Sequence, residues 1–450
     1  QNNEPASNAQ ARAMRYAVVN GQRRLVSAGN ATTDDRGTYR IFGLTAGDYL
    51  VGAEGREGSG DSMDLRLTSD ADVRHATNPD RRTPPPADRN VTLAMTYFPG
   101  STMASQAGII SVQAGEERSG VDFVLQLLPT AHVEGNVSLP GGGPPPFMEV
   151  ALISLGPAIV PGAPFETFRL IRPDTDGSFK FTNVSPGQYT VFARGGLGIA
   201  HPDGSTTDPT QLLWASTNVA VEGEHITGLS LSLEPGLSIS GQVRFEGRTL
   251  KPPADLRSIR VRVMPQIEGG MMFVPEPVNV SAHGRFTIPG AAPGRYRLTT
   301  SFPGSGRPGG WLVKSITAGG QDALDAPFTL QPNTHLRDAT ITFTERLAQL
   351  KGTLRTGAGA VTPEYNVVLF PADPSLWLAQ SRRIQSVRPS ADGAYVFRNV
   401  PAGDYLVAAV DDVEPGEWFD PAFLQRTAAS AARITIGEGE QKAQDIRVGG

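Results

Sequence analysis

The chain has 450 residues, a formal net charge of −5, 51 glycines, 37 prolines and no cysteine. The lack of cysteine excludes disulfides, thiolate metal sites and cysteine nucleophiles. The mildly acidic balance gives no electrostatic reason to expect a nucleic-acid partner, and no apolar run approaches the roughly 18 residues of a membrane span. We therefore expect neither a nucleic-acid-binding nor a membrane-spanning protein.

The most informative pattern is a motif that occurs four times. A glycine opens a short alternating strand, a second glycine follows ten residues later, and a tyrosine stands two positions after it. The first glycines of successive copies are 140, 107 and 109 residues apart, which indicates a repeated module with an insertion in the first copy. The motif residues are Gly37, Gly47 and Tyr49; Gly177, Gly187 and Tyr189; Gly284, Gly294 and Tyr296; and Gly393, Gly403 and Tyr405.

Alternating apolar residues on both sides of the second glycine predict two half-buried strands in each module; in the first, Tyr39 and Ile41 mark one of them. The Ala-Gly or Pro-Gly dipeptide between the strands predicts a type II turn with a positive φ at the glycine. The tyrosine is expected to be buried with its hydroxyl bonded to nearby backbone, as in a tyrosine corner. The predicted fold is all-β, with four tandem Greek-key β-sandwich domains.

The predicted domains are residues 1–128, 129–235, 236–346 and 347–450. The linkers between them are very short, so we expect a semi-rigid rod. Residues 54–90, rich in Gly, Ser, Asp, Arg and Pro, are predicted to form a long polar surface loop of the first domain. Helix is scarce: one short helix is expected after Asp420, which would cap it, with Pro421 at its first position.

The first domain lacks a predicted opening strand. In the other three domains a strand with a central glycine precedes the first motif glycine by 42, 43 and 41 residues, at Gly135, Gly241 and Gly352. The same offset from Gly37 falls before Gln1, so residues 1–8 are interpreted as the turn after that strand and residues 9–18 as the second strand. Residues 109–112 and 121–125 are expected to form the closing hairpin.

Three explanations for this missing strand are open. The sequence is a fragment whose upstream residues carry the strand, or the strand is shifted or dispensable, or another subunit supplies it. An opening strand buries about three aliphatic side chains, each stabilising by roughly 1.5–3 kcal/mol, against a whole-domain stability of about 5–15 kcal/mol. The gap would therefore favour strand addition from another chain, and repeated head-to-tail addition gives a filament.

Residues for catalysis do not form a recognisable constellation. None of the six histidines has the His/Glu spacing of a zinc peptidase, and nucleophile elbows, phosphate loops and dinucleotide fingerprints are missing from the sequence. Asp174 and Asp176 could offer oxygen ligands to calcium, but Asx turns are favoured because His283 stands at this place in the third domain. We predict no catalytic residue, no cofactor and no metal site.

Trp377 and Trp418 lie in predicted loops of the last domain. Exposed tryptophan rings stack on sugar rings, so these two residues are a candidate ligand platform. Half-buried packing at the edge of the domain is the favoured alternative.

The first motif, at residues 35–49, resembles the carboxypeptidase regulatory-like domain, a transthyretin-like (prealbumin-like) sandwich related to Ig-like folds. The last third resembles large secreted proteins of soil bacteria of the acidobacterial group, at residues 311–316, 370–373, 387–389, 392–393 and 413–418. The resemblance implies a secreted or cell-surface bacterial protein whose signal peptide has been removed. It implies no peptidase chemistry.

The leading functional hypothesis is a non-enzymatic, extracellular structural protein. Its molecules would form a head-to-tail homo-oligomer, a filament in which a donated β-strand completes the first domain. The alternative is a secreted or cell-surface array of domains that binds polysaccharide or another ligand, and an enzyme is a distant third.

Overall fold

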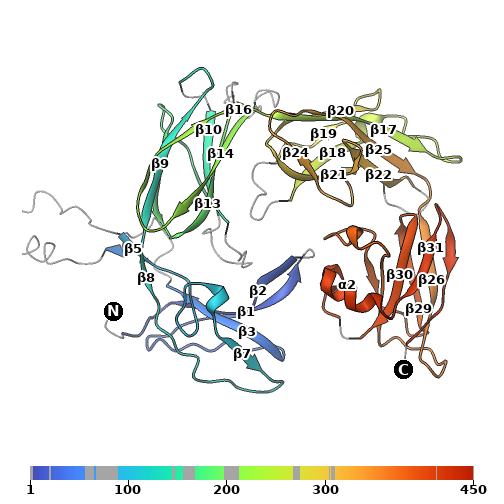
Figure 1. The fold of residues 1–450 in the computed structure, drawn as a ribbon, viewed down its shortest axis with the longest axis horizontal. Coiled ribbons are helices and arrows are strands. Elements are labelled where there is room, and N and C mark those ends of the chain that lie inside the picture. The colour runs from blue at the N-terminus through green and yellow to red at the C-terminus, as the bar shows by residue number, and fades with distance from the viewer. Residues whose placement is uncertain are drawn as a thin grey trace, which may run out of the picture. The chain divides into compact units, whose positions relative to one another are not determined.

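The computed structural model describes residues 4–19, 22–55, 65–66, 90–143, 147–155, 168–196, 212–266, 274–303, 305, 310–411 and 413–448. Most of the predicted loop at 54–90 lies outside them. The regular structure is almost entirely β, in many separate sheets (Figure 1). Residues 24–207 and 213–234 make up most of one compact unit, and residues 235–450 belong to a second. The four predicted domains are called modules one to four below.

Module two is built from two sheets. Its strands are β9 (Ala131–Ser138), β10 (Phe147–Ser154), β11 (Phe168–Ile171), β12 (Ser178–Val184), β13 (Gly187–Gly196), β14 (Leu212–Val221), β15 (Ile226–Ser232) and β16 (Glu234–Pro235). One sheet has the order β11-β10-β13-β14-β16 and the other β12-β9-β15. Phe181 of β12 and Val191 of β13 belong to one buried cluster, so the core lies between the sheets.

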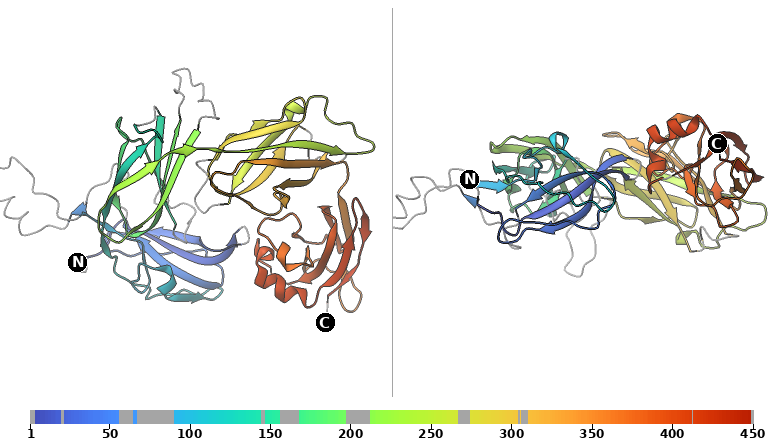
Figure 2. Two further views of the ribbon diagram at one scale, coloured as in Figure 1. Left: turned by 45° about the horizontal axis from the view of Figure 1, so that its top comes forward. Right: turned by 90° about the horizontal axis from the view of Figure 1, so that it is seen from below.

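Module three repeats this plan. Its strands are β17 (Leu237–Glu246), β18 (Arg260–Pro265), β19 (Val278–Asn279), β20 (Arg285–Ala291), β21 (Gly294–Ser301), β22 (Leu312–Ala318), β23 (Gln321–Asp322), β24 (Phe328–Leu330) and β25 (Leu336–Thr344), with a 3-10 turn, η3 (Leu256–Ser258). The sheets have the orders β20-β17-β25-β22-β23 and β19-β18-β21-β24. Figure 2 shows the two layers from other directions.

Module four has the same two sheets and a helix. Its strands are β26 (Ala348–Arg355), β27 (Asn366–Pro371), β28 (Gln385–Val387), β29 (Ala394–Val400), β30 (Gly403–Val410), β31 (Ala432–Ile436), β32 (Gln441–Ala443) and β33 (Ile446–Arg447), with 3-10 turns η4 (Pro374–Leu376) and η5 (Glu417–Phe419). The sheets are β29-β26-β32, with β33 also on β26, and β28-β27-β30-β31.

The predicted helix is confirmed as α2 (Pro421–Ala428), which lies beside β30 (Figure 1). The Asp420 side chain accepts a hydrogen bond of 2.9 Å from the backbone N–H of Ala422. Phe423 and Leu424 are buried on the inner side of the helix, in a cluster with Phe370. The sequence signal of an N-cap aspartate followed by proline was therefore sufficient to locate this helix.

Module one has one complete sheet. Its elements are β1 (Gln10–Val19), β2 (Gln22–Thr32), β3 (Gly47–Glu54), β4 (Leu65–Arg66), β5 (Asn90–Leu93), β6 (Thr96–Tyr97), η1 (Ala104–Gln106), β7 (Ile109–Val112) and β8 (Leu127–Pro129). The main sheet has the order β2-β1-β3-β6 with β7 also on β3, and β4-β5-β8 form a small second sheet. The prediction of a strand over residues 9–18 is confirmed by β1.

The tyrosine corner is confirmed in all four modules. Each motif tyrosine is buried, and its hydroxyl donates to the carbonyl oxygen four residues earlier: Tyr49 to Thr45 at 2.6 Å, Tyr189 to Ser185 at 2.9 Å, Tyr296 to Ala292 at 2.8 Å and Tyr405 to Pro401 at 2.7 Å. The bond ties the start of one inner strand to the turn that precedes it, which explains why the same residue recurs in each module.

The predicted type II turn at the second motif glycine is wrong. A type II turn needs a φ near +80° at this residue, whereas φ is 156° at Gly47 and Gly403. The left-handed conformation belongs to the first glycine, with φ of 72° at Gly37 and 74° at Gly393. In module two the second glycine leaves room for the tyrosine, because a Cβ at Gly187 would lie 3.2 Å from the ring of Tyr189.

Candidate strand-acceptor site

In modules two, three and four the opening strand is the middle of a sheet. In module two, β9 pairs antiparallel with the motif strand β12 and parallel with the closing strand β15. In module three, β17 pairs in the same way with β20 and β25, and in module four β26 pairs with β29 and with β32 and β33. The opening strand therefore lies between two strands that do not pair with each other.

In module one, the two segments that should flank an opening strand form no strand. They are residues 37–44, the counterpart of β12, and residues 121–125, the counterpart of β15, and both are fully described. The strand predicted at Tyr39 and Ile41 and the second half of the predicted closing hairpin are therefore wrong. The physical reason is that each of these segments pairs with the opening strand in the other modules, and among the described residues module one has no such partner.

The first of these segments keeps the turn and the bulge conformation of its counterpart in module two. The turn that leads into the first is the same as in the other modules: Asp34 N–H donates to Thr38 at 2.9 Å, as Asp174 N–H donates to Ser178 at 2.8 Å. Gly43 has a φ of 77°, close to the 54° of its counterpart Asn183 at the bulge of β12. The segment is thus preformed for pairing.

A hydrogen bond spans the gap between the segments. The Tyr39 hydroxyl donates to the carbonyl oxygen of Val121 at 2.7 Å. In module four the counterpart hydroxyl, that of Tyr395, donates to Gln444, and there β26 is in place between the two segments. Burial, helped by the negative charge of Asp122, raises the pKa of Tyr39 to about 12, so this hydroxyl stays protonated. We call the space between residues 37–44 and 121–125 the slot.

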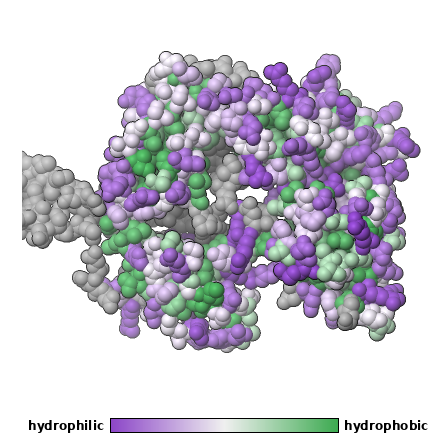
Figure 3. Space-filling model, viewed as in Figure 1, coloured by the Kyte–Doolittle hydropathy of each residue, from purple (hydrophilic) through white to green (hydrophobic). Residues whose placement is uncertain are grey.

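The inward side chains of the slot are apolar and only partly buried. Ile41 and Phe123 are half-buried, whereas their counterparts in module two, Phe181 and Leu231, are 0% and 2% exposed. Hydrophobic residues reach the visible surface of module one in the space-filling view (Figure 3, lower left). A strand in the slot would cover core positions that the other modules bury.

The outward side of the slot also carries large apolar residues. Phe42 is 84% exposed and Val124 is 66% exposed. Their counterparts in module four are Arg398 and Arg447, which suit a surface in water. The outward-facing residues beside the slot are thus apolar in module one, whereas the corresponding residues of module four are charged.

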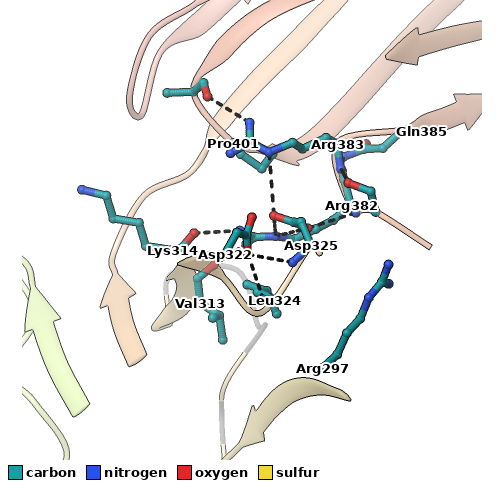
Figure 4. Close-up of polar contacts among 12 residues, drawn as sticks. Arg297, Val313, Lys314, Asp322, Leu324, Asp325, Arg382, Arg383, Gln385 and Pro401 are labelled. Carbon is teal, nitrogen blue, oxygen red and sulfur yellow. Dashed lines mark hydrogen bonds and ion pairs between the residues drawn. The ribbon is translucent and has the colours of Figure 1, made fainter. Parts of the chain in front are cut away.

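A polar joint connects modules three and four within the second unit. The buried carboxylate of Asp325, in the loop between β23 and β24, accepts bonds of 3.0 and 3.1 Å from Nε of Arg382. Arg382 also donates to the carbonyl oxygens of Val313 at 2.6 Å and Lys314 at 2.7 Å. Figure 4 shows Arg382 and Arg383 converging on Asp325. The joint fixes module four to module three through hydrogen bonds that leave few side-chain rotamers free.

One further residue, Lys314, strengthens this joint. The Lys314 ammonium lies 2.6 Å from the carboxylates of both Glu246 in module three and Glu438 in module four, and these bonds raise its pKa. Within module three, Glu345 accepts backbone N–H bonds from Leu250, Arg248 and Thr249. These bonds lower the pKa of Glu345 to about 2. The sequence analysis did not predict the joint, although the adjacent arginines 382 and 383 were a usable signal.

The histidines and aspartates have structural contacts. The Nδ1 atoms of His225 and His335 each accept a backbone N–H at the start of an opening strand, from His132 and Ser238, both at 3.0 Å. Asp176 accepts the Ser178 N–H at 2.9 Å, which is the Asx turn favoured over a calcium loop. Within the described ranges, no group of three acidic, histidine or cysteine residues is placed to hold a metal.

The tryptophan platform is not supported at Trp377. This side chain is 8% exposed; its ring packs edge-on against Phe370, and its N–H donates to Pro371 at 2.8 Å. Trp418 is half-buried in the same cluster, beside Phe419. The favoured alternative, packing at the edge of module four, describes both residues.

Comparisons with known proteins give no family. No protein-family model matches the chain, and no curated protein matches it. The resemblance to the carboxypeptidase regulatory-like domain and to acidobacterial secreted proteins therefore stays a prediction. Among the described residues, no helix is both long and apolar enough to cross a bilayer.

Several solved structures are weakly similar. The Bacillus anthracis TIE protein is 10% identical, with 98% of this chain and 68% of that chain covered and a TM-score of 0.17. A streptococcal ancillary pilin is 9% identical, with 70% and 98% covered and a TM-score of 0.22. A putative carbohydrate binding protein from Pseudomonas aeruginosa is 17% identical, with 23% and 88% covered and a TM-score of 0.18. TM-scores this low do not support an inference about function.

Proposed function

We propose that this protein is a non-enzymatic structural protein, secreted or held at the cell surface, whose copies associate head to tail into filaments. The observation that carries the proposal is the slot in module one. One edge, residues 37–44, keeps the turn and bulge conformation of a paired strand. The inward side chains of the slot are apolar, and an unpaired edge beside apolar side chains favours addition of a strand.

The outward face of the slot supports a second copy as the source of the strand. A strand that filled the slot would cover the inward side chains, but it would leave Phe42 and Val124 exposed to water. Large apolar residues that flank one site on a surface mark a protein contact. A donor strand attached to a folded neighbouring molecule would cover both faces. The donor strand and the slot are different surfaces of the molecule. When two copies join, one keeps a free slot and the other keeps a free donor strand, so further copies can add at both ends and the assembly grows linearly.

Self-association of the whole protein tests this function. Sedimentation velocity across a concentration series, with electron microscopy of the same samples, should reveal linear oligomers that lengthen with concentration. Phe42→Thr and Val124→Thr should each weaken self-association about tenfold or more, because a large apolar side chain leaves the contact.

The matched control is Ile109→Thr. Ile109 is 69% exposed but lies on β7, in the other sheet of module one, so its replacement should leave self-association unchanged. A monodisperse monomer at every concentration would contradict the proposed function, as would equal effects of the Ile109 and Val124 variants.

A further inference from the structure

We propose that one sheet face of module three binds an acidic polysaccharide, whose carboxylate groups are held by exposed arginines. The face is the outward side of the paired strands β18 and β21 (Figure 1). We call it the arginine face, after Arg260, Arg262 and Arg295. The inference does not rest on self-association, because it concerns another module and another kind of partner.

Module three has a charge opposite to that of the whole chain. Residues 236–346 contain 13 lysines and arginines against 8 aspartates and glutamates, a net charge of +5, whereas the chain carries −5. Each of the other three modules is net negative. A positive surface on an otherwise acidic protein attracts polyanions.

Alternation puts the arginines on the outward side of the sheet. Arg260 and Arg262 of β18 are exposed and stand on either side of the buried Val261. On β21, the exposed Arg295 precedes the buried Tyr296. Residues two apart on a strand are about 7 Å apart. The face therefore presents cations at intervals along the strand direction, as a linear polyanion requires.

The guanidinium groups of these three arginines are not neutralised by the described part of the chain. None of its ion pairs includes Arg260, Arg262 or Arg295, and carboxylates of module three are engaged elsewhere. Glu246, for example, pairs with Lys314. The donors of the arginine face are thus available to an external anion.

The same sheet face is closed in module four. The pairing registers of β18 with β21 and of β27 with β30 put Val368 at the place of Arg262. Val368 is buried in the apolar cluster that includes Phe423 and Leu424 of α2. In module four this face is therefore part of the folded core, whereas in module three it is charged and exposed.

One arginine on this side of the sheet has a structural contact instead. Arg297 is buried, and it donates to the carbonyl oxygen of Ala379 in module four. We therefore leave Arg297 out of the ligand site and assign binding to the three exposed arginines.

The uncharged residues beside the arginines favour a polysaccharide. Thr299 lies opposite Arg262, and Ser301 lies opposite Arg260. Both are exposed, and a hydroxyl can donate and accept hydrogen bonds. Arginine binds carboxylates through two parallel hydrogen bonds. Guanidinium and hydroxyl groups side by side suit sugars that carry both carboxylates and hydroxyls.

Other partners fit this face less well. Single-stranded nucleic acid is held by aromatic side chains that stack on its bases, and the outward residues of β18 and β21 include none. Duplex DNA is read by an element that enters a groove, which a sheet face does not do. A protein contact has an apolar centre, whereas Met264 is the one apolar outward residue of these two strands.

Polygalacturonate is the probe for this inference, because each of its sugars carries a carboxylate. The full chain should bind fluorescently labelled polygalacturonate saturably, and added salt should weaken the binding. The matched ligand is the fully methyl-esterified polymer, which has the same sugar chain without charge and should bind about tenfold more weakly or worse. Equal binding of the two polymers, or no binding of polygalacturonate, would overturn the inference.

Substitutions locate the binding face. Arg262→Gln should weaken binding of polygalacturonate about two- to fivefold, the effect of one exposed ion pair. Arg260→Gln, Arg262→Gln and Arg295→Gln together should weaken it about tenfold or more. The matched control is Arg285→Gln, which removes the same charge from an exposed position on β20, in the other sheet of module three. Equal weakening by Arg262→Gln and Arg285→Gln would contradict the assignment, because net charge alone would then explain binding.

A single-stranded oligothymidylate tests the class of partner. At the same concentration of charges it should bind about tenfold more weakly than polygalacturonate, because the arginine face offers its bases no stacking partner. Equal or tighter binding of the oligothymidylate would overturn the choice of a polysaccharide.

Discussion

Single side chains recur at the same places in each module, and their contacts explain why. The motif tyrosines fasten a turn, and the first motif glycines take a left-handed φ. A third recurring residue, six positions after the first glycine, is Gly43, Asn183, Gly290 or Asn399, all with φ between 54° and 77°. The tyrosine was predictable from its repetition. The third position was missed because asparagine and glycine share a backbone conformation but no sequence identity.

Glu345 should make the stability of module three depend on pH. Its pKa is lowered from 4.5 to about 2 by backbone N–H donors, so its contribution is present above pH 4.5 and is lost as the pH falls towards 2. Urea unfolding at several pH values should find Glu345→Gln less stable than the unmodified protein near neutrality, with the difference vanishing near pH 2. Glu364→Gln, at an exposed glutamate, is the control. A difference that does not change with pH would contradict the assignment.

Asp325 should be the most sensitive residue of the joint. Asp325→Ala leaves Arg382 and Arg383 without their carboxylate partner in a half-buried site, which costs about 3 kcal/mol, the low end of the range for a broken buried pair. Calorimetry should record a lower melting temperature for the transition that includes modules three and four. Glu117→Gln, which removes an exposed ion pair with Arg40, should leave the melting temperature unchanged. Equal effects of the two changes would argue against the joint.

At the scale of strands and helices, the alternation of apolar residues and the helix N-cap predicted most of the observed strands and the helix. β12, β20 and β29 lie where the motif predicted a strand, and α2 begins at its predicted cap. The failures lie in module one, where residues 37–44 have the same alternation but no described strand beside them. Alternation tells which side chains face a core; a strand also requires a neighbour that supplies backbone hydrogen bonds.

The opening glycines give a test at this scale. Gly352→Ala places a Cβ within overlap distance of the Gln444 carbonyl, so β26 and the closing strand must separate. We expect module four to lose about 1–3 kcal/mol of stability, the usual cost of overpacking. Gly357→Ala is the matched control, because its Cβ would meet nothing closer than 3.9 Å. Urea unfolding of both variants would show the contrast, and equal stabilities would contradict the steric requirement.

At the scale of the whole molecule, completeness differs between modules. In modules two, three and four, two sheets formed by the module's own strands enclose a buried core. In the described part of module one there is one five-stranded sheet, and no strand lies between residues 37–44 and 121–125. The sequence indicated this difference through a spacing. It could not reveal that Tyr39 and Val121 are hydrogen-bonded across the slot or that Phe42 and Val124 are exposed beside it. Both depend on contacts between residues far apart in the chain.

The most direct test of a donated strand is cryo-electron microscopy of the assembled protein at a resolution that separates strands. We expect an added strand between residues 37–44 and 121–125, antiparallel to the first segment and parallel to the second. That strand should belong to a neighbouring molecule. A slot closed by residues of the same molecule, or an assembly in which the slot faces solvent, would contradict it.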